Sequence, residues 1–221
     1  MKNTKKYLFL GSGFLAVYLI MLVIIKMNYL ASPVPGMDLP IMDFAFHMRN
    51  TLATTIFSID AKLFGDATGA VLALVVAAFL YFIPKEKMGA IWLLSSVGVT
   101  IVLNTLVKSI IGRPRPMIHR MSAFINESGK SFASGHSVFA TVLFGVLFLI
   151  LLQRLNRTGV KVIWGIFFFL VIVSIMFSRI YIGVHYPSDT IAGFLFGSSW
   201  LAFTYPIFVQ HKDWGNYQTK H

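Results

Sequence analysis

The sequence lacks cysteine and is poor in acidic residues, and each absence excludes a class of site. Without cysteine there is no disulfide, no thiolate metal ligand and no thiol nucleophile. Only 8 of the 221 residues are Asp or Glu, whereas sites for divalent cations depend on carboxylates and neutral histidines. Charged residues make up 12% of the chain, against about 25% in ordinary soluble domains. We therefore expect neither a soluble fold nor a metal or other cofactor.

Long apolar runs take up most of the chain instead. The mean hydropathy is +0.75, and 57% of the residues are hydrophobic. Six runs approach the roughly 20 residues that a helix needs to cross a bilayer. They lie near residues 7–25, 67–83, 89–107, 137–152, 160–177 and 190–209. These runs predict an all-α, polytopic membrane protein with six transmembrane helices, in which residues 1–221 form a single domain.

The first run follows Lys2, Lys5 and Lys6, as the apolar region of a signal peptide would. It is longer than the 7–15 residues usual there, and no small-x-small cleavage site follows it. We interpret it as the first transmembrane helix, with a cytoplasmic N-terminus. Alternation then places the C-terminus and the loops near 84–88 and 153–161 on the cytoplasmic side. Basic residues are divided almost evenly between the two sides, so the N-terminal lysines decide this orientation.

The net charge of +11 would suggest a nucleic-acid partner in a soluble protein. Here the basic residues lie in short loops, where anionic lipid headgroups and the topology rule account for them. No aromatic and basic surface stands apart from the spans. We expect membrane lipids as partners, no nucleic acid, and no obligatory protein partner.

Residues 26–66 form the longest stretch between spans. Pro33, Pro35 and Pro40 exclude a helix interior over residues 31–40. Beyond them, apolar residues recur at three- and four-residue steps: Ala45, Met48, Leu52, Ile56, Ile59 and Leu63. That spacing is typical of short helices in the membrane interface. Two interpretations fit, a lid for a lipid substrate and a plain connector, and we favour the connector.

Three polar patches lie at span ends on the expected outer side, at residues 108–116, 133–136 and 178–189. Arg, His and Asp are costly inside hydrocarbon, and polar groups at membrane depth usually mark a functional site. Because all three patches adjoin a span end, we expect them to meet at one membrane depth. For the third patch alone, a polar cap between two spans is the alternative interpretation.

The cations and helix ends of these patches suit an oxyanion. Lys108, Arg115 and Arg179 supply three positive charges, and the arginine fork matches phosphate oxygens. Ser134 and Gly135 open a helix whose free N–H groups can bind an anion. Three cations also disfavour a divalent metal at the same place.

The histidines of the patches add reactive groups. Pro187 suits the first turn of a helix, and helical spacing then brings Asp189 onto the same face as His185. The carboxylate can hold the imidazole Nδ1–H and leave Nε2 free. With His136 as a second proton carrier, the patches contain the nucleophile, proton donor and cationic cradle that phosphoryl transfer requires. Glu127 is the other acidic residue near them.

The spacing Lys108-x6-Arg115-Pro116, then Ser134-Gly135-His136, then Ser178-Arg179-x5-His185-x3-Asp189 resembles the type 2 phosphatidic acid phosphatase (PAP2) family. That family shares its core with acid phosphatases and vanadium haloperoxidases. One departure is visible, because Ala133 stands where the second motif usually has proline. The change bears on the rigidity of the loop and removes no reactive group.

The resemblance implies a role for each motif residue. His185 would attack phosphorus and form a phosphohistidine, with Asp189 orienting it. His136 would protonate the leaving oxygen and later activate water. The phosphoryl oxygens would be held by Lys108, Arg115, Ser134, the Gly135 N–H and Arg179. The family works without metal, at the outer face of the membrane.

Other polar residues are expected to be peripheral. Arg113 matches no position of the motifs, and we expect it to contact lipid headgroups, with contact to the substrate as the less favoured alternative. His119 and Arg120 lie in the same outer loop and are expected to be solvated. His47 is expected to lie in the membrane interface without a role in catalysis.

The sequence thus predicts an integral-membrane lipid phosphatase acting on undecaprenyl diphosphate, phosphatidylglycerophosphate or phosphatidate, with the first two favoured. Two alternatives stay open. The same site could pass the phosphoryl group to another lipid, as a phosphotransferase. The chain could also be a non-catalytic lipid-binding or transport protein, although the presence of both His136 and His185 argues against a dead site.

Overall fold

A computed structural model describes residues 4–83 and 86–218 of the chain. Lys2, Pro84, Lys85 and Lys220, which belong to the predicted cytoplasmic basic segments, lie outside the described residues. Within the described part, all regular structure is helical, which confirms the all-α prediction. The helices are α1 (Thr4–Asn28), α2 (Asp38–His47), α3 (Thr51–Leu63), α4 (Asp66–Phe82), α5 (Lys87–Ile111), the short 3₁₀ helix η1 (Ser122–Phe124), α6 (Gly135–Leu152), α7 (Thr158–Tyr181) and α8 (Pro187–Gln218).

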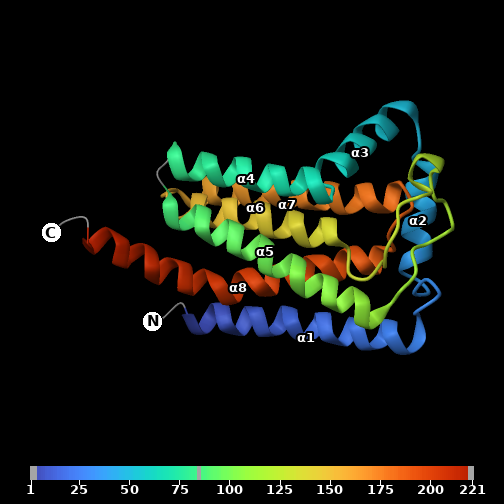
Figure 1. Cartoon of the computed structure of the whole chain (residues 1–221), viewed down its shortest axis with the longest axis horizontal. Helices are drawn as coiled ribbons and strands as arrows, with labels where there is room; N and C mark the ends of the chain where they lie inside the picture. Colours follow the sequence, from blue (N-terminus) through green and yellow to red (C-terminus); the bar gives the residue numbers. More distant parts are fainter. Residues whose placement is uncertain (1–3, 84–85, 219–221) are drawn as a thin grey trace.

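The long helices run side by side, with α2 lying across one end of the bundle and the two termini at the other end (Figure 1). Five of them, α1, α5, α6, α7 and α8, are long and apolar enough to cross a membrane. Helix α4 makes a sixth span when it is joined to α3, from which it is bent by 71°. Each predicted apolar run falls largely within one of these helices.

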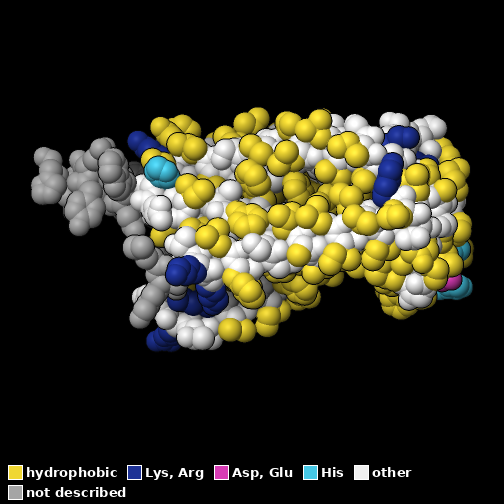
Figure 2. Space-filling view, turned by 90° about the horizontal axis from the view of Figure 1, so that it is seen from below, with side chains coloured by type: hydrophobic (Ala, Val, Ile, Leu, Met, Phe, Trp, Pro, Cys, Tyr) yellow, Lys and Arg dark blue, Asp and Glu magenta, His cyan; other side chains and the backbone are white. Residues whose placement is uncertain are grey.

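The flank of the bundle is covered with apolar side chains, while Lys and Arg gather toward its two ends (Figure 2). Large hydrophobic residues are exposed on most of the long helices, including Phe9, Ile20, Val71, Ile91, Val102, Ile163 and Ile207. Exposed apolar surface on helices of this length suits lipid, in which a helix satisfies its own backbone hydrogen bonds. The chain is therefore a multi-pass membrane protein.

Helices α6 and α8 cross at backbone contact because of two glycines on α8. A Cβ on Gly193 would lie 2.7 Å from the carbonyl oxygen of Ser134, and one on Gly197 would lie 2.9 Å from the Thr141 side chain. Glycines four residues apart allow such close approach between helices in a membrane. At this crossing the Ser134 N–H donates to the Asp189 carbonyl oxygen at 3.0 Å, so the second and third polar patches lie against one another.

The loop between α5 and α6 covers the turn between α7 and α8. Gly183 of that turn has a φ of +78°, and a side chain there would meet the backbone of His119. Glycine is suited to both conditions. The Met121 N–H donates to the Ile182 carbonyl oxygen at 3.1 Å. The turn that carries His185 is thereby buried beneath the loop.

The prediction of short helices within residues 26–66 is confirmed by α2 and α3. Asn50 caps α3, its side chain accepting a hydrogen bond from the Ala53 N–H at 2.9 Å. Arg49, just before this cap, donates through Nε to the carbonyl oxygen of Tyr181 at 3.2 Å. The segment is thus fastened to the end of α7.

Candidate active site

A cavity of about 730 Å³ opens at the end of the bundle where α2 and the α5–α6 loop lie. Its polar wall contains most of the predicted site residues, namely Lys108, Arg115, Gly135, His136, Arg179 and His185, together with Glu127. Its apolar wall includes Phe64, Gly69, Ile101 and Phe139, from α3–α4, α5 and α6. A polar pocket continuous with an apolar wall suits an amphiphile.

The three predicted cations reach the cavity from three different elements. Lys108 lies in the last turn of α5, and its Nζ donates to the Lys130 carbonyl oxygen at 2.7 Å. Gly112 then ends the helix with a φ of +74°. Arg115 follows in the loop and Arg179 lies in the last turn of α7, where it is almost wholly buried. The first and third patches therefore meet, as predicted.

Glu127 of the α5–α6 loop binds two of these cations. One carboxylate oxygen, Oε1, lies 3.3 Å from the Arg115 guanidinium and also forms an ion pair with Arg179. The Glu127 carboxylate thus contacts two guanidinium groups, and all three side chains line the cavity. The site can therefore accept an anionic oxygen between Arg115 and Arg179.

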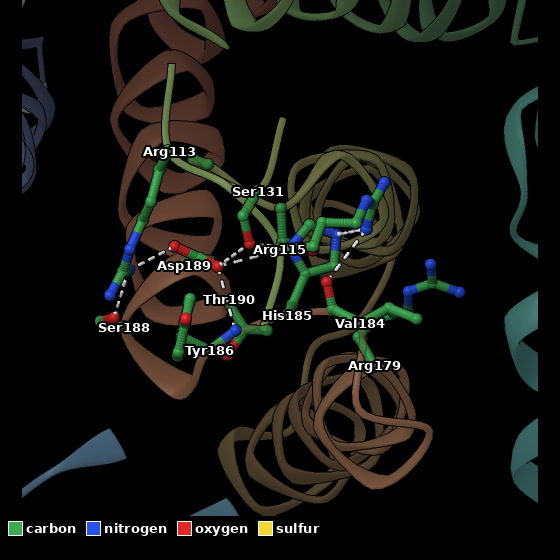
Figure 3. Close-up of polar contacts among 12 residues, drawn as sticks. Arg113, Arg115, Ser131, Arg179, Val184, His185, Tyr186, Ser188, Asp189 and Thr190 are labelled. Carbon is green, nitrogen blue, oxygen red and sulfur yellow. Dashed lines mark hydrogen bonds and ion pairs between the residues drawn. The ribbon is translucent and has the colours of Figure 1, made fainter. Parts of the chain in front are cut away.

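His185 presents its Nε2 atom to Arg115, whose guanidinium lies 3.0 Å away (Figure 3). Arginine only donates hydrogen bonds and keeps its proton, so Nε2 accepts. The hydrogen of the neutral ring is then assigned to Nδ1. This is the tautomer whose Nε2 lone pair faces the cavity.

Asp189 lies behind the imidazole. Its Oδ2 is 3.5 Å from Nδ1 of His185, longer than an ordinary hydrogen bond. Ser131 bridges the two, because its hydroxyl donates to Asp189 and lies 3.3 Å from Nδ1. Sequence reasoning missed Ser131, since a single serine in a polar loop carries no signal of its own.

The Asp189 carboxylate also completes the start of α8. His185 precedes this helix, so the predicted pairing arises across the helix start and not along one helical face. Pro187 is its first residue, as predicted, and the Tyr186 N–H donates to Asp189 Oδ2 at 3.0 Å. A side chain at the third helical position reaching back to the N-cap N–H is the geometry of a capping box.

His136 lies at the start of the central helix α6. Its Nε2 is 3.1 Å from the Ala61 carbonyl oxygen of α3, an acceptor, so we assign a hydrogen to Nε2. Nδ1 is then the atom that can take up or release a proton.

Ser134 and Gly135 differ in their access to the cavity. Ser134 is fully buried and caps α6, its hydroxyl accepting from the Ser137 N–H at 3.4 Å. Gly135 lines the cavity. Helix α6 begins where predicted. Gly135 lies at the surface of the cavity, whereas Ser134 is buried behind it.

The environment of His185 favours the neutral imidazole. Burial lowers the pKa of His185 well below its ordinary value, and the charges of Arg115, Lys108 and Arg179 lower it further. A neutral ring is required of a nitrogen nucleophile.

Comparison with known families bears on this geometry. The sequence profile of the PAP2 superfamily matches residues 89–213, more than half of the chain. The chain belongs to the PAP2 superfamily.

Phosphatidylglycerophosphatase B of Bacillus subtilis is 32% identical over 131 residues, covering 57% of this chain and 61% of the relative. Undecaprenyl-diphosphatase of Sulfolobus acidocaldarius is 33% identical over 132 residues, covering 58% and 59%. This PAP2 chain thus spans about three-fifths of the length of these curated relatives.

Solved structures support the same fold. The crystal structure of a transmembrane PAP2-type phosphatidylglycerolphosphate phosphatase from Bacillus subtilis matches with a TM-score of 0.75 at 24% identity, covering 91% of this chain and 96% of that one. Aquifex aeolicus LpxE matches with a TM-score of 0.56 at 26% identity, covering 76% and 95%. The first match extends over nearly the whole PAP2 chain, including most of the residues before the profile match.

The expectation that Arg113 contacts headgroups is wrong. Its side chain is fully buried and forms ion pairs with Asp189 at 2.6 Å and Asp38 at 3.3 Å. Arg113 lies only two residues before Arg115 in a segment without regular secondary structure, yet the two side chains have different partners. Arg113 lies on the side of Asp189 away from His185 (Figure 3).

The interpretation of residues 26–66 as a plain connector is also not supported. Ala61 and Phe64 line the cavity of this PAP2 chain, and Asp38 is buried against Arg113. His119 and Arg120 are partly exposed, and each also has a protein partner. Nε2 of His119 lies 2.7 Å from Oδ1 of Asp43, and Nε of Arg120 donates to the Phe124 carbonyl oxygen at 3.1 Å.

In the described part of this PAP2 chain, no group of three or more His, Asp or Glu side chains is placed to share an ion. The candidate site instead concentrates Lys and Arg.

Proposed function

We propose that this PAP2 chain is a metal-independent membrane lipid phosphatase that works through a phosphohistidine on His185. One observation carries the proposal: Nε2 of His185 lies beside Arg115 at a cationic cavity, while Nδ1 lies toward Asp189 and Ser131. The resemblance of the motifs and the names of the two curated relatives support the reaction class.

In the first half-reaction, the Nε2 lone pair of His185 attacks phosphorus. The bond between phosphorus and the leaving oxygen breaks, and this oxygen takes a proton from His136. Lys108, Arg115, Arg179 and the Gly135 N–H hold the remaining phosphoryl oxygens, where charge builds up in the transition state.

In the second half-reaction, water attacks the phosphohistidine. His136 accepts a proton from this water, the bond between phosphorus and Nε2 breaks, and inorganic phosphate leaves. His136 is then protonated again for the next cycle. The same residue serves as acid and base because the two steps are the reverse of each other in proton flow.

The substrates we propose are undecaprenyl diphosphate and phosphatidylglycerophosphate. The apolar wall formed by Phe64, Ile101 and Phe139 supports a lipid chain beside the phosphate. We also propose an extracytoplasmic site. The cavity is lined by residues of the α5–α6 loop, and this loop lies at the opposite end of the bundle from both termini (Figure 1), while the N-terminal basic residues favour the cytoplasm.

Phosphate release by the purified protein in detergent, with excess chelator, tests this function. Undecaprenyl diphosphate, phosphatidylglycerophosphate and phosphatidate are compared, with His185→Ala as the control. We expect release that chelator does not reduce and that the variant lacks. Phosphate release retained by His185→Ala would overturn the assignment of His185 as the nucleophile. Transfer of labelled phosphate to an added lipid instead of water would point to a phosphotransferase.

A further inference from the structure

Asp38 is the second carboxylate bound to Arg113, which it contacts through Nη2, whereas Asp189 is bound through Nη1. It lies at the start of α2, outside the residues matched by the family profile. Asp38, Arg113 and Asp189 are all fully buried. A buried charge of this kind is costly unless it is paired and hydrogen-bonded, so the arrangement calls for a physical reason.

Each contact of Asp38 comes from a donor. Its Oδ2 accepts from the Val34 N–H at 2.8 Å and from Arg113 at 3.3 Å. Its Oδ1 accepts from the Ser188 N–H at 2.8 Å, and the Ser188 hydroxyl donates to Oδ2 at 2.9 Å. A carboxylate that only accepts hydrogen bonds is ionised. Asp38 therefore contributes a full negative charge at the start of α8.

Arg113 joins the two carboxylates. Its Nη1 donates to Asp189 Oδ1 at 2.6 Å and to the Ser188 hydroxyl at 2.8 Å, and its Nη2 donates to the Ser32 carbonyl oxygen at 3.0 Å. The guanidinium also lies over the Tyr186 ring, 4.0 Å from its centroid. Its position is thus fixed on several sides.

The charges of this cluster do not cancel. Arg113 offsets one carboxylate, so two ionised carboxylates leave a net charge of −1 beside His185. Without Asp38, the Arg113–Asp189 pair would be neutral. The difference matters in the proposed reaction: when Nε2 of a neutral imidazole bonds to phosphorus and Nδ1 keeps its hydrogen, the ring gains a positive charge.

We propose that Asp38 is a positioning residue that, through Arg113, holds Asp189 in place and keeps the cluster net negative, so that the cationic phosphohistidine is stabilised. This inference rests on the proposed function and deepens it. It assigns a part in the reaction to a residue of the 26–66 segment. In a buried site of low dielectric, one unit charge is enough to change a rate measurably.

The test compares Asp38→Asn with Asp43→Asn, which lies on the same helix but is exposed and bound to His119. We expect Asp38→Asn to lower kcat about ten- to a hundredfold with little change in KM, because the charge acts mainly on the charged intermediate. Asp43→Asn is expected to behave as wild type. Equal kcat values for the two variants would overturn the inference and leave the proposed function standing.

A double variant separates charge from simple structural support. Adding Arg113→Gln to Asp38→Asn removes the charges of both side chains and leaves that of Asp189, so the net charge of the cluster is again −1. Part of the lost kcat is then expected to return. A purely structural role predicts that the double variant is worse than the single one, and that result would reject the charge argument. Should Asp38→Asn fail to fold, Asp38→Glu and Asp38→Gln make the same comparison at equal size. Absence of phosphate release by wild type itself would instead remove the proposed function, and with it the inference.

Discussion

The Arg115 guanidinium donates to Nε2 of His185 at 3.0 Å, so the atom proposed to attack phosphorus is hydrogen-bonded to a cation. This contact fixes the tautomer of the imidazole. Arg115 also donates to the Val184 carbonyl oxygen at 3.0 Å, which keeps the guanidinium beside the ring. When a phosphate enters, its oxygens can take the same donor while Nε2 turns to phosphorus.

Arg115→Ala is therefore expected to lower kcat/KM by about 10²- to 10³-fold, the usual cost of removing a donor to transition-state charge. Arg115→Lys keeps the charge without the fork and is expected to recover part of the loss. Steady-state phosphate release measures both. Arg157→Ala, an exposed arginine at the other end of the bundle, is the matched control, and equal rates for Arg115→Ala and this control would contradict the assignment.

Asp189→Asn should lower kcat by about 10³- to 10⁴-fold, as loss of the orienting carboxylate does in a hydrolase triad. Ser131→Ala, which removes the bridge but not the carboxylate, should cost only about tenfold, the scale of one hydrogen bond. Ser122→Ala in the exposed η1 helix serves as the control. A larger loss for Ser131→Ala than for Asp189→Asn would show that the serine, and not the carboxylate, controls the ring.

Glu127→Gln should strengthen binding of inorganic phosphate. The Glu127 carboxylate is bound to Arg115 and Arg179, so an incoming phosphate must compete with it, and a competing state weakens apparent affinity. We expect product inhibition by phosphate to become about tenfold stronger. Weaker inhibition would show that Glu127 mainly holds the arginines in position.

His185 makes stability depend on pH. Its pKa is lowered by burial and by Arg115, so below about pH 6.5 the unfolded chain binds a proton that the native protein does not. Stability then rises with pH in this range and falls as the solution becomes acidic, by up to about 1.4 kcal/mol per pH unit. Thermal unfolding in detergent should show a shallower acid loss for His185→Gln than for wild type. His211→Gln, at the far end of α8, provides the comparison, and identical slopes in all three proteins would count against the buried neutral ring.

Membrane orientation is open to direct measurement because the chain has no cysteine of its own. Ala123→Cys lies on the exposed η1 helix at the cavity end, and Asn156→Cys lies in the exposed α6–α7 loop at the other end. In intact cells a membrane-impermeant maleimide should label only the first. Labelling of only the second would reverse the proposed orientation.

The sequence was most informative where reactive residues adjoin a span end. Lys108, Arg179 and His185 each follow an apolar run, and membrane depth alone brings such positions together, so their convergence could be predicted. The helix starts at Ser134 and Pro187 were predictable for a similar reason, since capping residues act locally.

Contacts between distant segments could not be predicted in this way. Asp38 lies 75 residues from Arg113, and nothing in the spacing of either residue indicates the pair. Ser131 and Glu127 lie in an irregular loop, which has no periodicity to read. The burial of Arg113 was missed because it lies in a segment without regular secondary structure, where no periodicity indicates which side chains are buried. One readable signal was overlooked: Gly193 and Gly197 form a G-x-x-x-G pattern.

The glycine crossing of α6 and α8 divides the molecule into a part of fixed dimensions and a part that can be remodelled. With the two backbones in contact at Gly193, the starts of α6 and α8, which adjoin His136 and His185, are held close together. On the α3–α4 wall, Phe64 and Ala70 line the cavity, and Phe64 contacts α6 through its ring and not through its backbone. A protein engineer who wishes to change the lipid that is accepted should therefore vary that wall and leave the crossing untouched.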